Sequence, residues 1–248
     1  MTRHLRLLIA ATFLMAFQLP AQEASRAPDG GTSYRVDGVE LLGIPNKPLS
    51  GKSSIEWTRT LEDGSTVTVH LEANLARDSQ GRMYRERRSF VPVNSGQQPR
   101  LTEIRLLDPA AKSQANCTVA TKQCIVSDYR PRTSFRLMPA GAFANGTRFL
   151  AREDLGTNTI EGMNVAGTKE TVTVNAGVLG NDRPLASTRE FWYSAELETN
   201  LAVTRIDPRE GKQVVKLVEL SRSEPDPRLF EIPDGYSVRD ARVQSSPQ

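Results

Sequence analysis

Between Ser33 and about residue 220, apolar and polar residues alternate in short runs, and turn-forming residues interrupt these runs about every ten positions. Ile55 and Trp57 have the same parity, Asp63-Gly64 provides a tight turn, and alternate residues from Val67 to Leu75 are again apolar. This pattern predicts a long hairpin at the start of an antiparallel β meander. We therefore expect an all-β or mainly β domain with at most one or two short helices.

The same reasoning predicts several further strands. Gly156 to Val174 alternates Thr with Val or Ile, which indicates two strands that turn at Gly162 or Gly167. A single helical turn is expected at 139–143 or at 226–230. The other predicted extended segments are 82–93, 101–107, 116–129, 148–154, 189–193, 201–206 and 213–220.

The first twenty-one residues have the three regions of a secretory signal peptide. Arg3 and Arg6 precede an apolar stretch at 7–17, which is too short to cross a bilayer, and Gln18-Leu-Pro-Ala21 follows. No cysteine lies near the expected cleavage site, so attachment of a lipid to a new N-terminal cysteine is excluded. We expect a periplasmic or secreted protein with no integral membrane segment after cleavage.

The expected organisation is a signal peptide at 1–21, a polar segment at 22–32, one domain at 33–238 and a polar tail at 239–248. Removal of the signal peptide takes away Arg3 and Arg6, which lowers the formal charge from +3 to +1. A nearly neutral surface argues against nucleic acid as a partner.

Cys117 and Cys124 are the two cysteines of the chain. Symmetric pairing about a turn at Ala120-Thr121 places them opposite each other, with Cα atoms within the disulfide range of about 4.4 to 6.8 Å. In an exported protein this arrangement predicts one structural disulfide. The alternative is a catalytic redox pair, but such a pair normally has the spacing Cys-x-x-Cys, which these two cysteines lack.

Catalytic and metal-binding chemistry finds little support in the sequence. His70 is the sole histidine after signal cleavage, and its parity is opposite to that of Val69 and Leu71, so we expect it to face solvent. No metal, cofactor or catalytic residue is predicted. A hydrolase based on two carboxylates remains an alternative, with candidates Glu72, Glu86, Glu103, Glu190, Glu196 and Glu219.

The C-terminal third resembles a known family. An aromatic strand at Phe191-Trp-Tyr193, a strand that ends at Ile206-Asp-Pro208, and the motif Leu229-Phe-x-Ile-Pro-x-Gly-Tyr236 are similar to the end of the periplasmic lipoprotein-carrier (LolA/LolB-like) superfamily and related exported bacterial proteins. The resemblance implies a strongly curved antiparallel sheet that forms an incomplete barrel, with acyl chains held on its concave face.

This resemblance suggests a ligand cavity, although ordinary core packing explains the same residues. The first hypothesis is a non-enzymatic envelope protein that binds a lipid or an acylated lipoprotein. The second is an interaction or sensing module with a filled core that binds an envelope protein through a sheet edge or loops. The candidate cavity residues are Ile55, Trp57, Val67, Val69, Leu71, Phe191, Tyr193, Val203, Val215 and Leu217.

Overall fold

The computed structural model of the chain describes residues 39–131 and 138–242. The chain divides into residues 1–35 and 36–248, and everything described belongs to the second unit. The expected signal peptide at 1–21 and the polar segment at 22–32 lie outside the described residues, so both stay predictions. The expected tail at 239–248 begins within the last strand, Ser237–Asp240.

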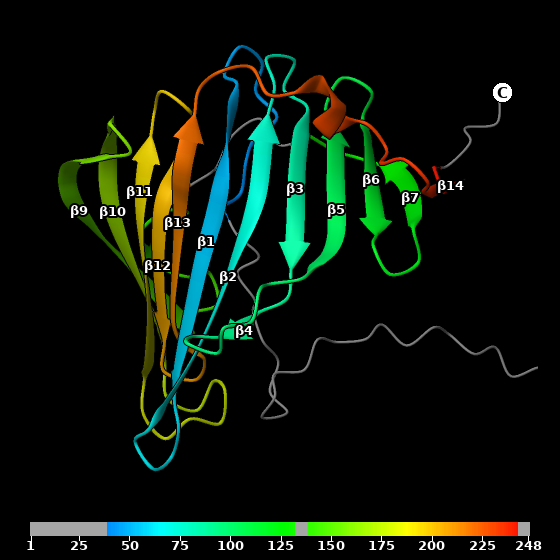
Figure 1. Ribbon diagram of the computed structural model, residues 1–248. Coiled ribbons are helices and arrows are strands. Elements are labelled where there is room, and N and C mark those ends of the chain that lie inside the picture. Colours follow the sequence, from blue (N-terminus) through cyan, green and yellow to red (C-terminus); the bar gives the residue numbers. More distant parts are fainter. Residues whose placement is uncertain (1–38, 132–137, 243–248) are drawn as a thin grey trace, which may run out of the picture. The chain divides into compact units, whose positions relative to one another are not determined.

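Within the described residues, fourteen strands form one sheet, and the short strand β4 lies off its main path beside β2. The order along the sheet is β14-β7-β6-β5-β3-β2-β1-β13-β12-β11-β10-β9-β8 (Figure 1). The predicted all-β class is confirmed. The strands are β1 (Leu49–Thr60), β2 (Thr66–Arg77), β3 (Met83–Arg88), β4 (Val91–Pro92), β5 (Leu101–Asp108), β6 (Ser113–Thr118), β7 (Gln123–Asp128), β8 (Gly141–Ala142), β9 (Arg148–Ile160), β10 (Met163–Val174), β11 (Leu185–Ser194), β12 (Thr199–Asp207), β13 (Gly211–Ser221) and β14 (Ser237–Asp240).

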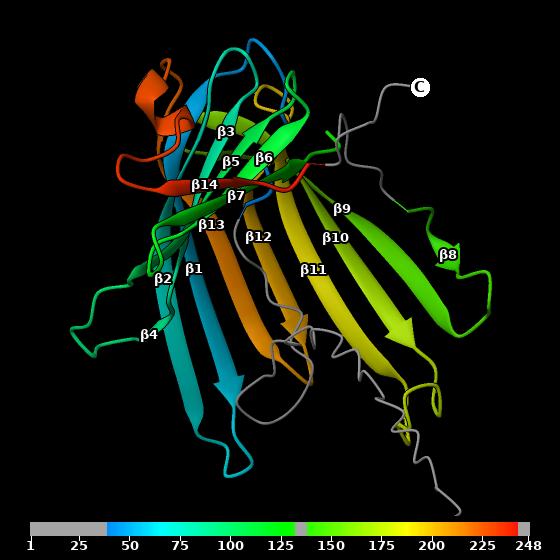
Figure 2. The same ribbon diagram turned by 90° about the vertical axis from the view of Figure 1, so that its right-hand side faces the viewer.

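Two antiparallel meanders make up the sheet. One contains β1 to β7 and the other β8 to β13, and they meet where β1 pairs with β13. The sheet curves strongly, and its end strands β14 and β8 do not pair with each other (Figure 2). This is the incomplete barrel that the sequence resemblance implied.

Most sequence-predicted strands are present. The hairpin of β1 and β2 turns at 61–65, and β9 and β10 turn at Glu161-Gly162, so Gly162 and not Gly167 marks that turn. The helical turn predicted at 226–230 is a short 3₁₀ helix, η1 (Pro227–Phe230), capped by the Asp226 side chain. The alternative at 139–143 is wrong, because Gly141 and Ala142 pair with β9 as a short strand.

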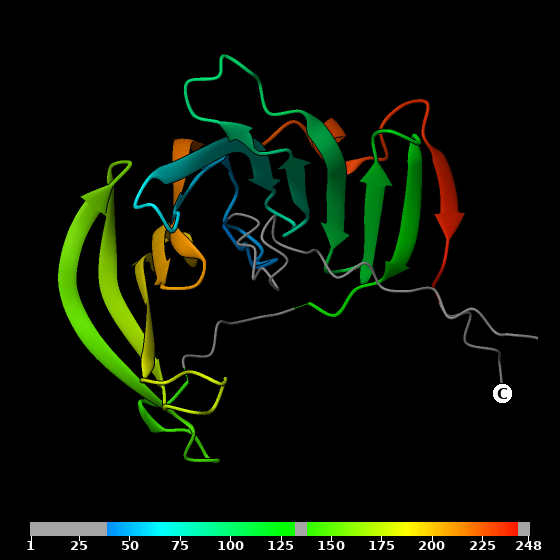
Figure 3. The ribbon, with the colours of Figure 1, turned by 90° about the horizontal axis from the view of Figure 1, so that it is seen from below.

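The concave face carries the larger hydrophobic core. Side chains from β1, β2, β12 and β13 pack there against Val39 and Leu41. The segment before β1, to which these two residues belong, lies within the curve of the sheet (Figure 3). The Val39 amide donates to Ser53 Oγ at 3.3 Å, which fixes this segment on β1. The concave face is therefore covered in part by the chain itself.

A second core lies on the opposite, convex face of β3, β5, β6 and β7. After β13, the chain turns back across this face as residues 222–236, which we call the C-terminal strap (Figure 3). The strap leads directly into β14, which pairs with β7 in parallel orientation. Its apolar side chains, which come from the motif that carried the family resemblance, are Leu229, Phe230, Ile232 and Tyr236.

Candidate functional site

The structure places half of the predicted cavity residues in one row across the concave face. Direct partners in neighbouring antiparallel strands point to the same side of the sheet. The register aligns Leu71 with Ile55, Ile55 with Val215, Val215 with Val203, and Val203 with Phe191. The parity of the sequence pattern thus indicated residues that do lie together.

This apolar row is largely buried. Ile55 and Val215 are each 1% exposed, and both belong to the core that contains Val39 and Leu41. Leu217 belongs to the same core, whereas Trp57 and Val69 are paired and half-buried and Val67 is 40% exposed. Tyr193 lies beyond an irregularity in the pairing of β11 with β12.

Two pockets flank the described part of the sheet, and neither is lined by any of the ten predicted cavity residues. The first has a volume of about 210 Å³ and lies on the convex face beneath the C-terminal strap. The second, of about 600 Å³, is polar and open and is lined by Asn46, Lys47, Glu196 and Arg222 among others. The ion pairs Lys47–Glu198 and Arg222–Glu196 at the second pocket satisfy its charged groups with one another.

Next to the apolar row, the concave face carries a row of charged and polar side chains, which we call the charged band. It contains Arg152, Glu170, Arg189, Arg205 and Gln213, aligned by direct pairing from β9 to β13. Glu170 accepts hydrogen bonds from Arg152 at 2.6 Å and from Arg189 at 3.1 Å. The Glu170 side chain is only 11% exposed, and its two ion pairs hold both guanidinium groups against the sheet.

Arg189 and Arg205 stand opposite each other, which would be unfavourable for two like charges alone. Glu170 offsets the charge of Arg189, and Asp207 and Glu210 lie 3.9 and 3.4 Å from Arg205. Burial opposes ionisation of Asp207, but hydrogen bonds from Arg209 outweigh it and hold the pKa of Asp207 below its ordinary value.

The band ends at the aromatic side chain of Trp57 and the buried amide of Gln213. Trp57 donates its indole N–H to the Glu210 carbonyl at 2.6 Å and packs edge-on against Phe90. Beside Trp57, Gln213 is 3% exposed, and within the described part of the chain neither its Nε2 nor its Oε1 has a hydrogen-bond partner. Sequence reasoning missed the band, although Arg189, Arg205 and Gln213 share strand parity with predicted cavity residues.

Strand β9 carries the charged band to an open edge of the sheet. Within the described residues, its outer side pairs only with β8, at Phe149 and Leu150. The rest of β9 is almost entirely solvent-exposed and contains the uncharged run Leu155 to Ile160. We call the part of β9 from 151 to 160 the β9 edge. Among the residues that the structure describes, no strand pairs with its outer backbone groups, which could therefore pair with an added strand.

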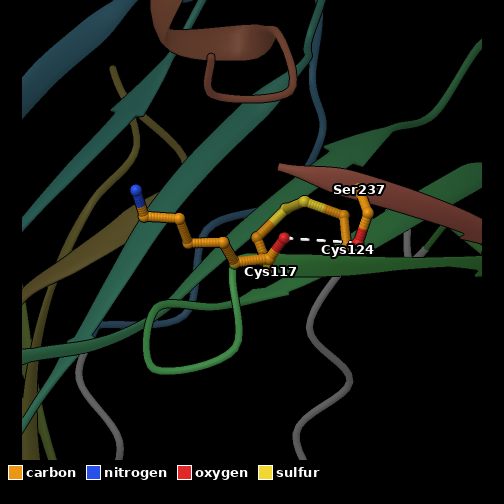
Figure 4. The surroundings of a disulfide bond; sticks show 4 residues. Cys117, Cys124 and Ser237 are labelled. Atoms are coloured by element: carbon orange, nitrogen blue, oxygen red, sulfur yellow. Dashed lines mark hydrogen bonds between the residues drawn. A yellow bond between two sulfur atoms is a disulfide. The ribbon is translucent and has the colours of Figure 1, made fainter. Parts of the chain in front are cut away.

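The predicted disulfide is present. Cys117 and Cys124 are direct partners in β6 and β7, fully buried, with Cα atoms 3.9 Å apart, slightly closer than expected. Next to the disulfide, the Ser237 hydroxyl at the start of β14 donates to the Lys122 carbonyl at 3.4 Å (Figure 4). The disulfide lies in the convex-face core, as a bridge with a structural role would.

Candidate chemical groups are dispersed or already paired. His70 is half-buried rather than fully exposed, opposite Glu56 and Val91. Among the candidate carboxylates, Glu86, Glu103, Glu196 and Glu219 each form an ion pair with Arg or Lys. The described residues contain no group of three or more His, Cys, Asp or Glu side chains arranged to hold a metal ion. They also contain no helix with the length and apolar character needed to cross a bilayer.

Comparisons with known proteins find similarity in structure only. No protein-family model and no curated protein matches the chain. An uncharacterised conserved protein from Thermus thermophilus is 12% identical with a TM-score of 0.40, and the match covers 78% of this chain and 90% of that one. A chain in the MucA/MucB complex of Pseudomonas aeruginosa is 13% identical with a TM-score of 0.37, covering 76% of this chain and 56% of that one.

A domain described as an outer membrane lipoprotein-sorting protein, from Vibrio parahaemolyticus, is 11% identical with a TM-score of 0.19. Its match covers 74% of this chain and 89% of that one. At these identities and scores the likeness concerns the fold alone.

Proposed function

We propose that this protein is a non-enzymatic interaction module of the cell envelope, which binds an extended segment of a protein partner as an additional strand along the β9 edge. The observation that carries the proposal is the outer side of β9 from 151 to 160, along which the described residues place no paired strand. Main-chain hydrogen bonds would supply affinity in such a complex, and neighbouring side chains would supply specificity.

Three features of the structure support this mode of binding. The apolar row is packed against Val39 and Leu41, as expected for a module with a filled core. The run from Leu155 to Ile160 lacks charge and proline, which commonly protect edge strands from pairing. Arg152, Glu153 and Asp154 lie at the other end of the edge, where they can select the charge of an incoming strand.

Site-specific photocrosslinking in the organism of origin tests the proposal. A benzophenone amino acid at Thr157 should form one discrete protein adduct, and the same group at Thr66, an exposed threonine on the interior strand β2, should not. The added substitution Thr159→Lys should abolish the adduct at 157, because a lysine on the edge disfavours pairing. Equal adducts at 157 and 66, or none at 157, would count against the proposal.

A second candidate function is binding of an apolar ligand or a lipoprotein acyl chain on the concave face. The observation in its favour is that Trp57 and Val69 form a half-buried pair beside the 40% exposed Val67. A native mass spectrum of gently purified protein separates the two candidates. A bound lipid mass that disappears in the variant Trp57→Ala would favour the second.

A further inference from the structure

The pocket beneath the C-terminal strap lies apart from the β9 edge and contains none of the ten predicted cavity residues. Its floor is a cross-strand row on the convex side, in which Leu106 pairs with Ala115 and Ala115 pairs with Val126. Phe230 and Ile232 of the strap line the same pocket from above. We call this space the strap slot.

The strap slot has a local origin in the sequence. Ala115 is buried between two larger residues, Leu106 and Val126, so the middle of the row lacks side-chain volume. Protein cores are normally packed to the density of organic crystals, and missing volume of this kind lowers stability unless something fills it. A leucine or valine at 115 would supply the missing atoms.

The roof of the slot is held in place at several points. Arg82 lies over the Phe230 ring at 5.0 Å, and its Nε donates to Asp78 at 2.6 Å. At the start of the strap, the Glu224 carboxylate accepts hydrogen bonds from the backbone and side chain of Ser79. These contacts keep the strap from settling onto Ala115.

The slot is suited to an apolar group. Besides Arg82, two of its polar neighbours are already engaged: Asp108 accepts from the Ala111 amide at 2.8 Å, and Gln114 donates to Ser127 at 3.2 Å. The other lining residues, around a volume of about 210 Å³, are apolar: Met83, Leu106, Leu107, Ala115, Val126, Phe230 and Ile232. An apolar cavity of about 150 Å³ is sufficient to bind benzene.

We propose that the strap slot is a binding site for one small apolar group, the size of an aromatic ring or a short alkyl chain of about six carbons. This group is either a free molecule or the end of a longer acyl chain that enters from the open side. The site goes beyond the proposed function, because it shares no residue with the β9 edge.

Methyl-detected NMR of the full mature protein tests the proposal, with benzene and decanoate as separate probes. Benzene should shift the methyl signals of Leu106, Val126 and Ile232 in a saturable way. If the site takes the end of an acyl chain, decanoate should shift the same signals. If it takes only a small free molecule, benzene should shift them and decanoate should not. The variant Ala115→Leu should weaken binding about tenfold or more, since one extra methylene in a pocket already has this effect.

Three controls make the result decisive. Ala115→Leu should unfold at the same urea concentration as the parent protein or a higher one, and Ala115→Val replaces it if it does not fold. Ala73→Val, at a buried alanine on the concave face, should leave the benzene shifts at Leu106 and Val126 unchanged. Absence of saturable shifts with both probes, or equal binding by the Ala115 variant, would overturn the proposal.

Discussion

Arg77 shows how a single residue holds distant parts of this chain together. Its side chain is fully buried, on the same parity of β2 as Leu75. Its guanidinium donates to the carbonyls of Lys47 at 2.8 Å, Leu42 at 2.9 Å and Leu197 at 2.7 Å. These carbonyls belong to the segment before β1 and to the β11–β12 turn. Burial lowers the pKa of Arg77, in agreement with a site that provides carbonyls but no direct carboxylate partner.

We predict that Arg77→Met destabilises the protein by about 3 kcal/mol or more. The substitution leaves three carbonyls without their donor, and each unsatisfied buried group costs about 1 to 3 kcal/mol. Arg77→Lys should also destabilise, because one ammonium group cannot replace the planar fork of donors. Urea unfolding of the three proteins measures the difference. An unchanged midpoint for Arg77→Met would show that the carbonyls find other partners.

At the scale of elements, the β6–β7 hairpin and the C-terminal strap stabilise each other. The disulfide joins β6 to β7, and β14 adds to the far side of β7 with Val238 opposite Cys124. Tyr236 and Ile232 of the strap pack on the core that contains both cysteines. Because all four residues of β14 are exposed, this strand depends on the hairpin for its position.

The double variant Cys117→Ala/Cys124→Ala should lose about 2 to 3 kcal/mol of stability, since the closed loop is short. Amide hydrogens of β14 should exchange faster in this variant, whereas those of β12 and β13 should change less. Urea unfolding and hydrogen-exchange mass spectrometry provide the two measurements. If β14 kept its full protection, its position would not depend on the bridge.

At the scale of the whole molecule, ionised carboxylates contribute to stability on both faces of the sheet. Glu86 on β3 is half-buried, which opposes its ionisation, but hydrogen bonds donated by Arg88, Asn74 and Tyr84 outweigh this and lower its pKa. The pKa of Asp207 is also lowered, and that of Asp240 falls to about 2 through its hydrogen bonds with Arg242.

We therefore expect stability to fall as the solution is acidified. Lowered carboxyl pKa values mean that the folded protein binds these protons more weakly than the unfolded chain does. Their contribution is complete above the ordinary values of 3.8 and 4.5, and it is lost as the pH falls below them. Urea midpoints at pH 6 and pH 3 measure the loss. Glu86→Gln should reduce the difference, and the exposed Glu62→Gln provides the control.

Local sequence patterns determined most of the strands and turns. Alternation of apolar and polar residues fixes an extended segment, and Asp63-Gly64 or Gly162 fixes a reversal, because both depend on neighbouring residues alone. The pairing of Cys117 with Cys124 follows for the same reason, since the two lie in adjacent strands of one hairpin. Five of the ten residues that the sequence suggested for a ligand cavity are aligned by the register, and their role in binding stays a prediction.

Only the tertiary structure decided which residues of the sheet are buried and on which of its two faces. Both faces of the sheet are covered in part, the concave one by residues before β1 and the convex one by the strap, so neighbours such as Leu75 and Ala76 are both buried. Alternation therefore cannot separate inside from outside at these positions. The pairing of β1 with β13, the alignment of the charged band and the volume missing at Ala115 all depend on contacts between distant segments. No local pattern specifies such contacts, because they arise only when the two meanders join.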